Sequence, residues 1–470
     1  MYSNKTYKLK LPSGVVTPIR PNQNAFYYYI TWAEEMNKRN DPDTPKLIMA
    51  LIGRPTAPLY EPIRDANNLY WNTIKMGKAI EYTDAGRGSI EHRERIASAF
   101  SNEYATQIHK ENVIFTVGGK SALNAWSHLF KTLQPNKKLV IAIPYYPDHL
   151  NLSDLGLKSK NVIFINTLED NNDYKLTAKK LELALSGTNP SDVGGFVFCD
   201  PSNPMGYSIG EFEWRKIVRV LLKYETAMIL LDEAYSEMVF NEPHFSLLRV
   251  APDALKKQIV LLRSATKGLS AAGERMAVII AFQDEFVEVI AQFNDNNIIH
   301  SPISSQFAYS YAMERLTVEE KLNLAGFYRG FVVDVQKLLK QTGFHFKSET
   351  YQISSTFYVV ADFKSLFGSP LDERASKVFL GERACVESDV DVAYHLLFKY
   401  KVAFCPMSFF GAAPELGLLR ITCSFVGDEF ETLEERVRMI RSDVEVCKQN
   451  SGFKRKISSL LAREIELNEI

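Results

Sequence analysis

The stretch IVLLRSATKGLSAAGERMAVIIAF, residues 259–282, places a cluster of polar side chains between two short apolar runs. Short continuous apolar runs are typical of strands that helices cover on both faces of a sheet. Lys267 follows the first run, and Arg275 comes directly before the second. Ligands of such sheets bind where the loops leave the strand ends, so these two cations are candidate site residues.

The same pattern recurs through the middle of the chain. Longer stretches with helical spacing separate the apolar runs, and alternation of strand and helix implies an α/β fold with a mostly parallel sheet between helices. The predicted strands are 139–143, 162–165, 195–199, 228–232, 259–263 and 277–282, and the predicted helices between them include 121–134, 176–186 and 210–224.

The length predicts more than one domain. The chain has 470 residues, whereas single hydrophobic cores stop growing beyond roughly 250–300 residues. Residues 61–310 hold most of the alternating pattern and are predicted to form the large domain. Residues 1–60 with 311–470 are predicted to form a smaller α+β domain, with charged helices at 314–341 and 428–448 and short strands near 357–362 and 418–424. Residues 451–470 have the pattern of a charged amphipathic helix.

Composition excludes several classes of function. Lys and Arg number 55 against 56 Asp and Glu, without the basic clusters that nucleic-acid binding needs. No apolar run is long enough for a membrane span or a signal peptide. The five cysteines include no CxxC pair, which favours a reduced cytoplasmic protein. The histidines do not show metal-ligand spacing, so no metal site is expected.

Side chains after the predicted strands suit an aldehyde cofactor. Lys267 can form an imine with an aldehyde, and the carboxylate of Asp232, at the end of a buried strand, can hold a pyridine nitrogen protonated. Tyr235 and Asn203 can hydrogen-bond a ring hydroxyl. The groups suited to a phosphate are Ser264, Thr266, Arg275 and the helix start Gly118-Gly119-Lys120-Ser121, while Tyr145 or Tyr146 could stack on a ring.

Taken singly, each motif also has a structural explanation. Asn203-Pro204-Met205-Gly206 is a good turn, Asp232 could cap a helix, and Arg420 could be an ion-pair partner within a short strand. His300 is best interpreted as a loop histidine. The order of the motifs, each at a strand end, favours one shared site.

The motifs together resemble the fold-type I pyridoxal-phosphate (PLP) enzymes, and in particular the class I/II aminotransferases of the aspartate aminotransferase superfamily. The resemblance runs from about Ile52 to Ser424. It rests on DPSNPMG (200–206, resembling NPxNPTG), LLDEAY (230–235, resembling D-x-A/G-Y), SATKGLSAAGERMA (264–277, resembling S-x-S-K and G-x-R-x-G), FCPMSFFG (404–411, resembling P-G-x-x-F-G) and LLRITCS (418–424).

The resemblance implies roles in binding PLP. Lys267 carries the cofactor as an imine and then acts as general acid and base. Asp232 pairs with the pyridine nitrogen, and Tyr146 stacks on the ring. The remaining cofactor contacts that the family implies are Tyr235 and Asn203 for the ring oxygen, and Gly119, Lys120, Ser264 and Arg275 for the phosphate.

The resemblance also implies substrate contacts and a dimer. Arg420 clamps the substrate α-carboxylate, and Gly53 lies in an N-terminal loop that closes over the substrate. Tyr82 resembles the tyrosine that reaches the phosphate of the neighbouring subunit, which implies a homodimer with shared active sites.

The function implied is transfer of an amino group between an L-α-amino acid and a 2-oxo acid. Met205 and Met407 replace the threonine and glycine of the family motifs, so a PLP-dependent lyase, decarboxylase, oxidase or synthase is the alternative. A non-enzymatic PLP-sensing regulator is less well supported, because only about fifty residues precede IGRP (52–55), without a helix-turn-helix pattern.

Overall fold

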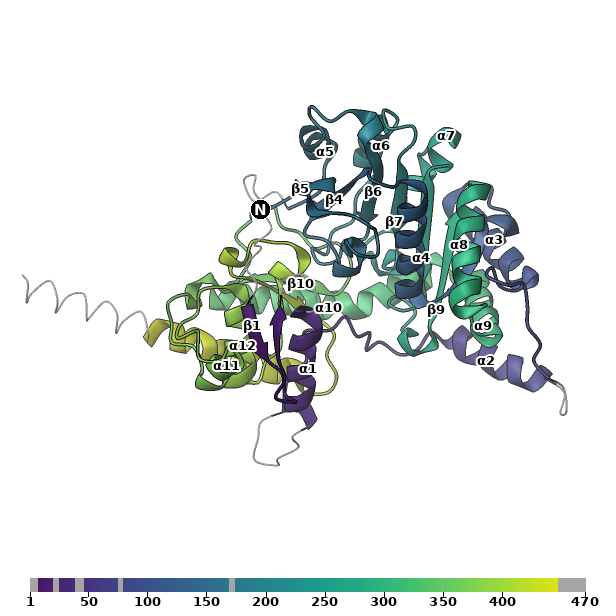
Figure 1. Cartoon of the computed structure of the whole chain (residues 1–470). Coiled ribbons are helices and arrows are strands. Elements are labelled where there is room, and N and C mark those ends of the chain that lie inside the picture. Colours follow the sequence, from purple (N-terminus) through teal and green to yellow (C-terminus); the bar gives the residue numbers. More distant parts are fainter. Residues whose placement is uncertain are drawn as a thin grey trace, which may run out of the picture.

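The computed structural model describes residues 7–19, 25–38, 46–74, 79–168, 174–348 and 350–446. Its core is a seven-stranded sheet in the order β3-β9-β8-β7-β6-β4-β5, which confirms the predicted α/β fold (Figure 1). The strands are β3 (Val113–Val117), β4 (Lys138–Ile143), β5 (Val162–Asn166), β6 (Val193–Cys199), β7 (Met228–Asp232), β8 (Ile259–Ser264) and β9 (Met276–Ala281).

Only β9 runs against the other strands of this sheet. It is antiparallel to both of its neighbours, β3 and β8, while β8, β7, β6, β4 and β5 are joined by parallel pairing. The carboxyl ends of six strands and the first residue of β9 therefore lie along the same edge.

Alternate residues of each strand point to opposite faces, and both faces are buried. Leu230 on β7 packs against α4 and α8, whereas its neighbour Leu231 belongs to the core on the other face, with α3 and α6. The helices are α1 (Ala25–Lys38), α2 (Glu61–Thr73), α3 (Ile90–Tyr104), α4 (Gly118–Leu133), α5 (Ala178–Ala184), α6 (Glu211–Leu221), α7 (Asp253–Lys256), α8 (Asp284–Ile298), α9 (Ile303–Arg315), α10 (Val318–Thr342), α11 (Glu373–Val378) and α12 (Asp389–Tyr400).

A second, antiparallel sheet has the order β10-β12-β11. It consists of β10 (Tyr358–Asp362), β11 (Cys405–Pro406) and β12 (Leu418–Thr422). The N-terminal hairpin of β1 (Tyr7–Lys10) and β2 (Val16–Ile19) lies on the same side of the molecule as α1, α11 and α12, at the lower left of Figure 1. The long helix α10 extends from this side to the region beneath the larger sheet.

Two elements differ from the sequence-based expectation. The strand β3 is not among the predicted strands, because Thr116 interrupts its short apolar run. The predicted helix 314–341 is two helices, since α9 ends at Arg315 and a new helix starts after Thr317. Thr317 and Glu320 form a reciprocal capping box there, which is a helix-start signal readable in the sequence.

The strand pattern in the C-terminal part agrees with the expectation near 357–362 and 418–424. Helical residues extend over 429–446, and the predicted helix 451–470 lies outside the described residues. Within the part of the chain that the structure describes, no helix is long and apolar enough to cross a membrane.

Candidate active site

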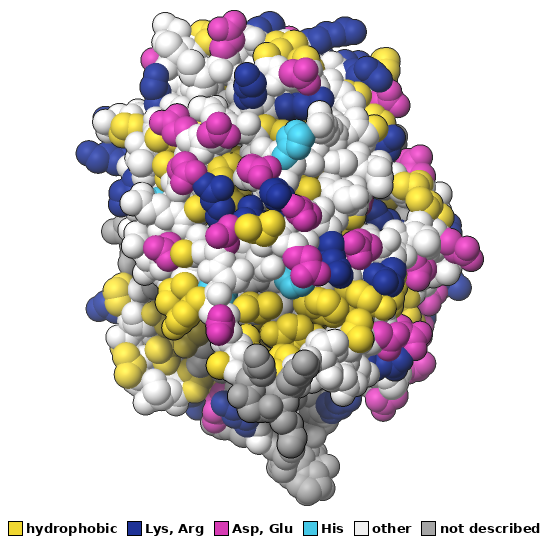
Figure 2. Space-filling view, turned by 90° about the vertical axis from the view of Figure 1, so that its right-hand side faces the viewer, with side chains coloured by type: hydrophobic (Ala, Val, Ile, Leu, Met, Phe, Trp, Pro, Cys, Tyr) yellow, Lys and Arg dark blue, Asp and Glu magenta, His cyan; other side chains and the backbone are white. Residues whose placement is uncertain are grey.

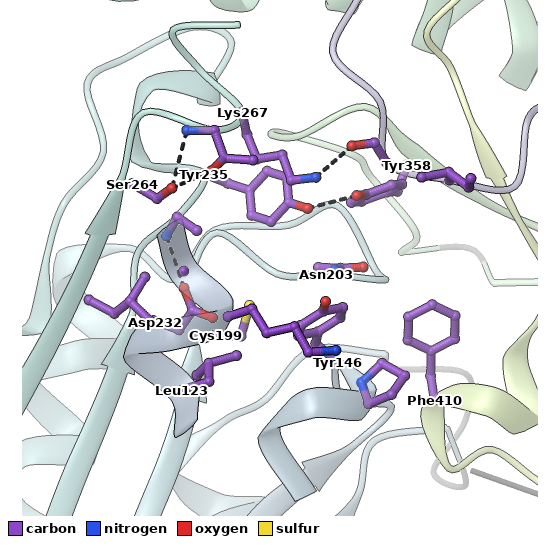
Figure 3. Close-up of a pocket in the computed structure, with 18 of the residues that line it drawn as sticks. Leu123, Tyr146, Cys199, Asn203, Asp232, Tyr235, Ser264, Lys267, Tyr358 and Phe410 are labelled. Atoms are coloured by element: carbon purple, nitrogen blue, oxygen red, sulfur yellow. Dashed lines mark hydrogen bonds between the residues drawn. The ribbon is translucent and has the colours of Figure 1, made fainter. Parts of the chain in front are cut away.

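A pocket of about 280 Å³ opens at the edge of the sheet where the strand ends meet (Figure 3). Each predicted cluster reaches it because β3, β4, β6, β7 and β8 all end there and β9 begins there. The lining comes from both sheets and from α1. It includes Phe26, Ile52, Gly53, Gly119, Lys120, Leu123, Tyr146, Cys199, Asn203, Asp232, Tyr235, Ser264, Thr266, Lys267, Arg275, Tyr358, Phe410 and Arg420.

Lys267 lies in the pocket three residues beyond the end of β8. Its Nζ donates a hydrogen bond of 2.5 Å to the carbonyl oxygen of Gly53. Burial, together with the cations Arg420 and Arg275, lowers the pKa of Lys267 to about 8, although Asp232 acts in the opposite direction. Near neutral pH most of this amine is still protonated, but the neutral form, which attacks a carbonyl, is far more populated than in a lysine with the ordinary pKa of 10.5.

Asp232 ends β7 and is 5% exposed. One carboxylate oxygen, Oδ2, lies 2.7 Å from Nε2 of His149, and the other accepts the backbone N–H of Ala234 at 3.0 Å. His149 was not predicted, since it belongs to a short 3-10 helix, Pro147–Leu150, and only the fold brings it beneath Asp232. No helix starts at Asp232, so the capping interpretation is wrong.

Cys199 lies beside this carboxylate at the end of β6 and also lines the pocket. Ligand atoms of Cys199, His149 and Asp232 lie within 4.8 Å of one another. Burial raises the pKa of the Cys199 thiol well above its ordinary value, with a further contribution from Asp232. The Cys199 thiol is therefore neutral.

Two tyrosines meet on the opposite side of the pocket. The hydroxyl of Tyr235 lies 2.7 Å from the hydroxyl of Tyr358, which comes from β10 of the smaller sheet. Burial raises the pKa of both hydroxyls, so both are neutral donors. Tyr358 was not predicted, because its run of apolar neighbours is typical of any buried strand.

Arg420 enters the pocket from β12 and is 2% exposed. Its Nη1 donates to Oδ1 of Asn203 and its Nη2 to the carbonyl of Leu51, both at 2.8 Å. The guanidinium lies 4.1 Å from the ring centre of Tyr358 and 4.7 Å from that of Phe410. Its Nε has no hydrogen-bond partner among the described residues. The described partners of this guanidinium are neutral oxygens and not carboxylates. Its positive charge is therefore available to bind an anion.

A cradle for a second anion lies at the N-terminus of α4. Gly118 adopts a φ of +72°, and a Cβ built on it would lie 2.6 Å from Nη2 of Arg275, so only glycine lets this guanidinium approach the helix end. Ser264 Oγ donates to Thr266 Oγ1 at 2.6 Å on the neighbouring turn. Helix N–H groups, hydroxyls and a guanidinium are the donors that bind phosphate.

Lys120 and Tyr146 lie at the rim. Nζ of Lys120 is 3.4 Å from Oδ2 of Asp148, and this lysine side chain is 67% exposed. The hydroxyl of Tyr146 donates to the same carboxylate at 2.9 Å. Asp148 therefore orients both the ring and the ammonium group.

Tyr145, the alternative stacking ring, does not line this pocket, and neither does Tyr82. The Tyr82 side chain is 80% exposed, and its ring packs edge-on against His300, with ring centres 5.8 Å apart. Gly53, by contrast, lines the pocket directly.

Comparisons with known proteins agree with this geometry. The family "Aminotransferase class I and II" matches residues 57–437. A (5-formylfuran-3-yl)methyl phosphate transaminase of Methanocaldococcus jannaschii is 28% identical over 280 residues, which cover 58% of this chain and 66% of that relative, just under two thirds. A probable aspartate/prephenate aminotransferase of Rickettsia felis is 25% identical over 348 residues, or 72% of this chain and 76% of the relative.

Solved structures share the fold. The aspartate aminotransferase of Thermus thermophilus with maleate superposes with a TM-score of 0.70 at 20% identity, covering 88% of this chain and 96% of that one. The aspartate aminotransferase of Rhizobium meliloti gives a TM-score of 0.72 at 19% identity, with 88% and 95% covered.

The lowered pKa predicts how Lys267 reacts. In protein freed of cofactor, the rate of imine formation with added PLP should rise as pH increases through about 8, because only the neutral amine attacks. Arg420→Gln removes a cation and should move this midpoint to higher pH. Stopped-flow absorbance measures the rate. Lys267→Ala has no amine at this position and should not show this imine formation. A midpoint that Arg420→Gln leaves in place would contradict the proposed electrostatic cause.

The contact between Gly53 and Tyr358 predicts a second result. A Cβ on Gly53 would lie 2.0 Å from the Tyr358 hydroxyl oxygen but 3.2 Å from its Cζ. Gly53→Ala should destabilise the protein by about 1–3 kcal/mol through overpacking and weaken PLP binding. Adding Tyr358→Phe to this variant should restore part of the lost stability, measured by thermal unfolding, and part of the lost PLP affinity, measured by cofactor titration. Gly210→Ala, where the added Cβ meets nothing within 4 Å, is the control.

Proposed function

The chain belongs to the class I and II aminotransferase family, whose members use PLP, and from this membership we propose that it transfers an amino group between an L-α-amino acid and a 2-oxo acid. The observation that carries the proposal is the position of Lys267. Its amine, with a pKa lowered to about 8, shares one pocket with Asp232 and Arg420.

The residues present fit the cofactor. Asp232 offers a buried carboxylate to a pyridine nitrogen, and Lys267 offers an amine to an aldehyde. The cradle of Arg275, Ser264 and the N-terminus of α4 suits the phosphate. Gly119 forms part of that helix start, and Lys120 at the rim adds positive charge on the same side. When bound, PLP supplies an aldehyde that accepts the amino group and a ring that withdraws electrons from the substrate.

The side chains around the ring have separate tasks. Tyr146 would stack against the ring, and Asp148 holds its hydroxyl. Tyr235 would donate to the ring oxygen in a direction that Tyr358 fixes, and Asn203 would contact the same oxygen. His149 holds Asp232 in place, so that its carboxylate could pair with a pyridine nitrogen.

Lys267 and Arg420 act on the substrate. The guanidinium of Arg420 binds the α-carboxylate, while Asn203 and the Leu51 carbonyl keep it in the pocket. Lys267, once its Nζ is neutral, would accept the proton of the substrate α-carbon at Nζ and hold it there for return. Because burial and two cations lower its pKa, the amine can both accept and release that proton near neutral pH.

The two sheets are proposed to belong to two domains, residues 61–310 and residues 1–60 with 311–470. Gly53 lies at their junction, where its carbonyl accepts from Lys267. The loop around Gly53 is proposed to close over the substrate, because Ile52 and Gly53 line the pocket. Gly53 has no side chain and so leaves room for the Tyr358 hydroxyl.

The working form is proposed to be a homodimer. Figure 2 shows hydrophobic side chains gathered in the lower part of the face that carries α2 and α9. Water-exposed apolar patches of this kind often mark protein interfaces. Tyr82 is proposed to reach the phosphate of the partner's site across this face. The exposed apolar residues in and around these helices are Leu59, Leu69, Trp71, Ile80, Tyr82 and Ile299.

A single-turnover assay tests the transfer itself. PLP-loaded protein mixed with a panel of L-amino acids should lose the aldehyde-derived absorbance band and release a 2-oxo acid, leaving pyridoxamine phosphate. Added 2-oxo acid should restore the band. Lys267→Ala should slow the conversion by at least about 10²–10⁴-fold, the usual contribution of a general acid and base.

The same assay separates the alternative reactions. Continuous release of product from the amino acid alone, without a 2-oxo acid, would show a lyase, decarboxylase or oxidase instead. Absence of pyridoxamine phosphate with every amino acid would reject the proposed transfer.

Mixed dimers test the shared site. Tyr82→Ala and Lys267→Ala proteins should each be nearly inactive, but unfolding and refolding them together should restore about a quarter of the wild-type activity, since half of the dimers then hold one intact site. Sedimentation should show a dimer throughout. Lys267 and Asp232 belong to the same subunit's site, so mixing Lys267→Ala with Asp232→Ala leaves one lesion in every site, and that pair should not recover. Mixing Tyr82→Ala with Asp232→Ala should recover as the first pair does.

A further inference from the structure

A buried histidine outside the pocket lies between two buried carboxylates. The side chain of His244 is 3% exposed, and its Nε2 lies 2.8 Å from Oδ2 of Asp200. Its other nitrogen, Nδ1, lies 3.8 Å from Oε2 of Glu233, which is fully buried. Only the contact with Asp200 is short enough for a hydrogen bond, and the contact with Glu233 is at ion-pair distance. The geometry therefore fits an imidazolium that is hydrogen-bonded to Asp200 and attracted by the charge of Glu233.

The charged groups facing His244 come from three strands. Asp200 follows β6, Glu233 follows β7, and Arg263 lies on β8. Burial disfavours the imidazolium, but Glu233 and Asp200 outweigh burial and the repulsion from Arg263, and they raise the pKa of His244. Glu233 also accepts the Tyr104 hydroxyl at 2.7 Å, and the Ser246 hydroxyl donates to its second oxygen.

The two carboxylates lie where the site loops leave the sheet. Cys199 and Asp232 are paired at the ends of β6 and β7, and Asp200 and Glu233 are the next residues. Asp200 accepts the backbone N–H of Ile209 at 2.8 Å, which closes the loop that follows β6.

That loop carries Asn203 into the site. Oδ1 of Asn203 accepts the hydrogen bond from Arg420, the group assigned to the substrate carboxylate. The family motif resembled by DPSNPMG has an asparagine where this chain has Asp200. A carboxylate at this position gives His244 a countercharge that an asparagine lacks.

We propose that His244 is a positioning residue of the active site, which by bridging Asp200 and Glu233 holds the loop 200–206 so that Asn203 orients Arg420 for the substrate carboxylate. His244 touches neither cofactor nor substrate and acts through Asp200. The inference rests on the proposed function only for the identity of the substrate, an amino acid with an α-carboxylate.

Two conservative variants test it in the PLP-loaded protein. His244→Gln keeps one donor but loses the charge, and Asp200→Asn removes the countercharge. Each should raise KM for the amino donor by about tenfold, the effect of one lost charge-assisted hydrogen bond, and change kcat much less. The double variant should be no worse than either single variant, because both break the same bridge.

The charge also predicts a pH dependence. The bridge is complete below the pKa of His244 and is lost as pH rises through it, so the ratio of KM in His244→Gln to KM in wild type should fall toward one at high pH. Hydrogen–deuterium exchange of the amides in 200–206 should be faster in both variants at low pH, and this readout does not depend on activity.

Controls distinguish positioning from simple stability. His128→Gln, on the exposed side of α4, should leave KM and exchange unchanged. Ile217→Val, in the core of α6, should lower the melting temperature without raising KM. If the His244 and Asp200 variants lower only the melting temperature, with unchanged KM and exchange at 200–206, the inference is wrong. If wild type converts no amino acid, the proposed function fails, while faster exchange at 200–206 would still support the bridge.

Discussion

Parallel neighbouring strands that end at one edge of a sheet are the constraint on which this site depends. β4, β6, β7 and β8 run in the same direction, and the antiparallel β9 begins where β8 ends. The last residues of β6 and β7, Cys199 and Asp232, are paired, and Asp232 is paired with Leu262 near the end of β8, so the loops leave these strands at nearly the same height. Asp232 and Lys267 can therefore share a pocket although no local interaction joins them in the sequence.

The pocket concentrates positive charge. Lys267, Arg275 and Arg420 line it, and Asp232 is the buried carboxylate that faces them. Charges so close in a poorly solvated space interact strongly. One consequence is the lowered pKa of Lys267, because another cation there is costly. A second consequence is that the two guanidinium groups offer separate sites for two anions, which we propose are a phosphate and a carboxylate. The same arrangement thus prepares the amine for reaction and provides the two anchors of the ligands.

The sequence was most informative where a polar residue follows an apolar strand. Asp232, Lys267 and Arg275 could be predicted because the end of a run marks the ligand-binding edge. His149 and Tyr358 could not, since their contacts with Asp232 and Tyr235 join segments 83 and 123 positions apart, and such pairings are determined by tertiary packing. The strand β3 was missed because its five residues include a threonine, and a pattern that short does not distinguish a strand from a loop. Tyr82 was predicted only through the family motif, and its role in the partner's site stays a prediction.

Three of the hydrogen bonds that join loops of the larger sheet to other parts of the chain involve functional groups. Lys267 donates to Gly53, Tyr235 meets Tyr358, and Arg420 donates to Asn203. Neutral hydrogen bonds contribute roughly 0.5–1.5 kcal/mol and charged ones somewhat more, which is too little to lock two layers together. Their importance is geometric, because displacing a reacting group by about 1 Å can cost on the order of a hundredfold in rate. The rigidity of the junction also rests on backbone hydrogen bonds, such as the one from the Tyr145 N–H to the Phe410 carbonyl, and on packing. Arg420 is enclosed between the rings of Tyr358 and Phe410, and these buried aromatic contacts hold in place the guanidinium that is proposed to bind the substrate carboxylate.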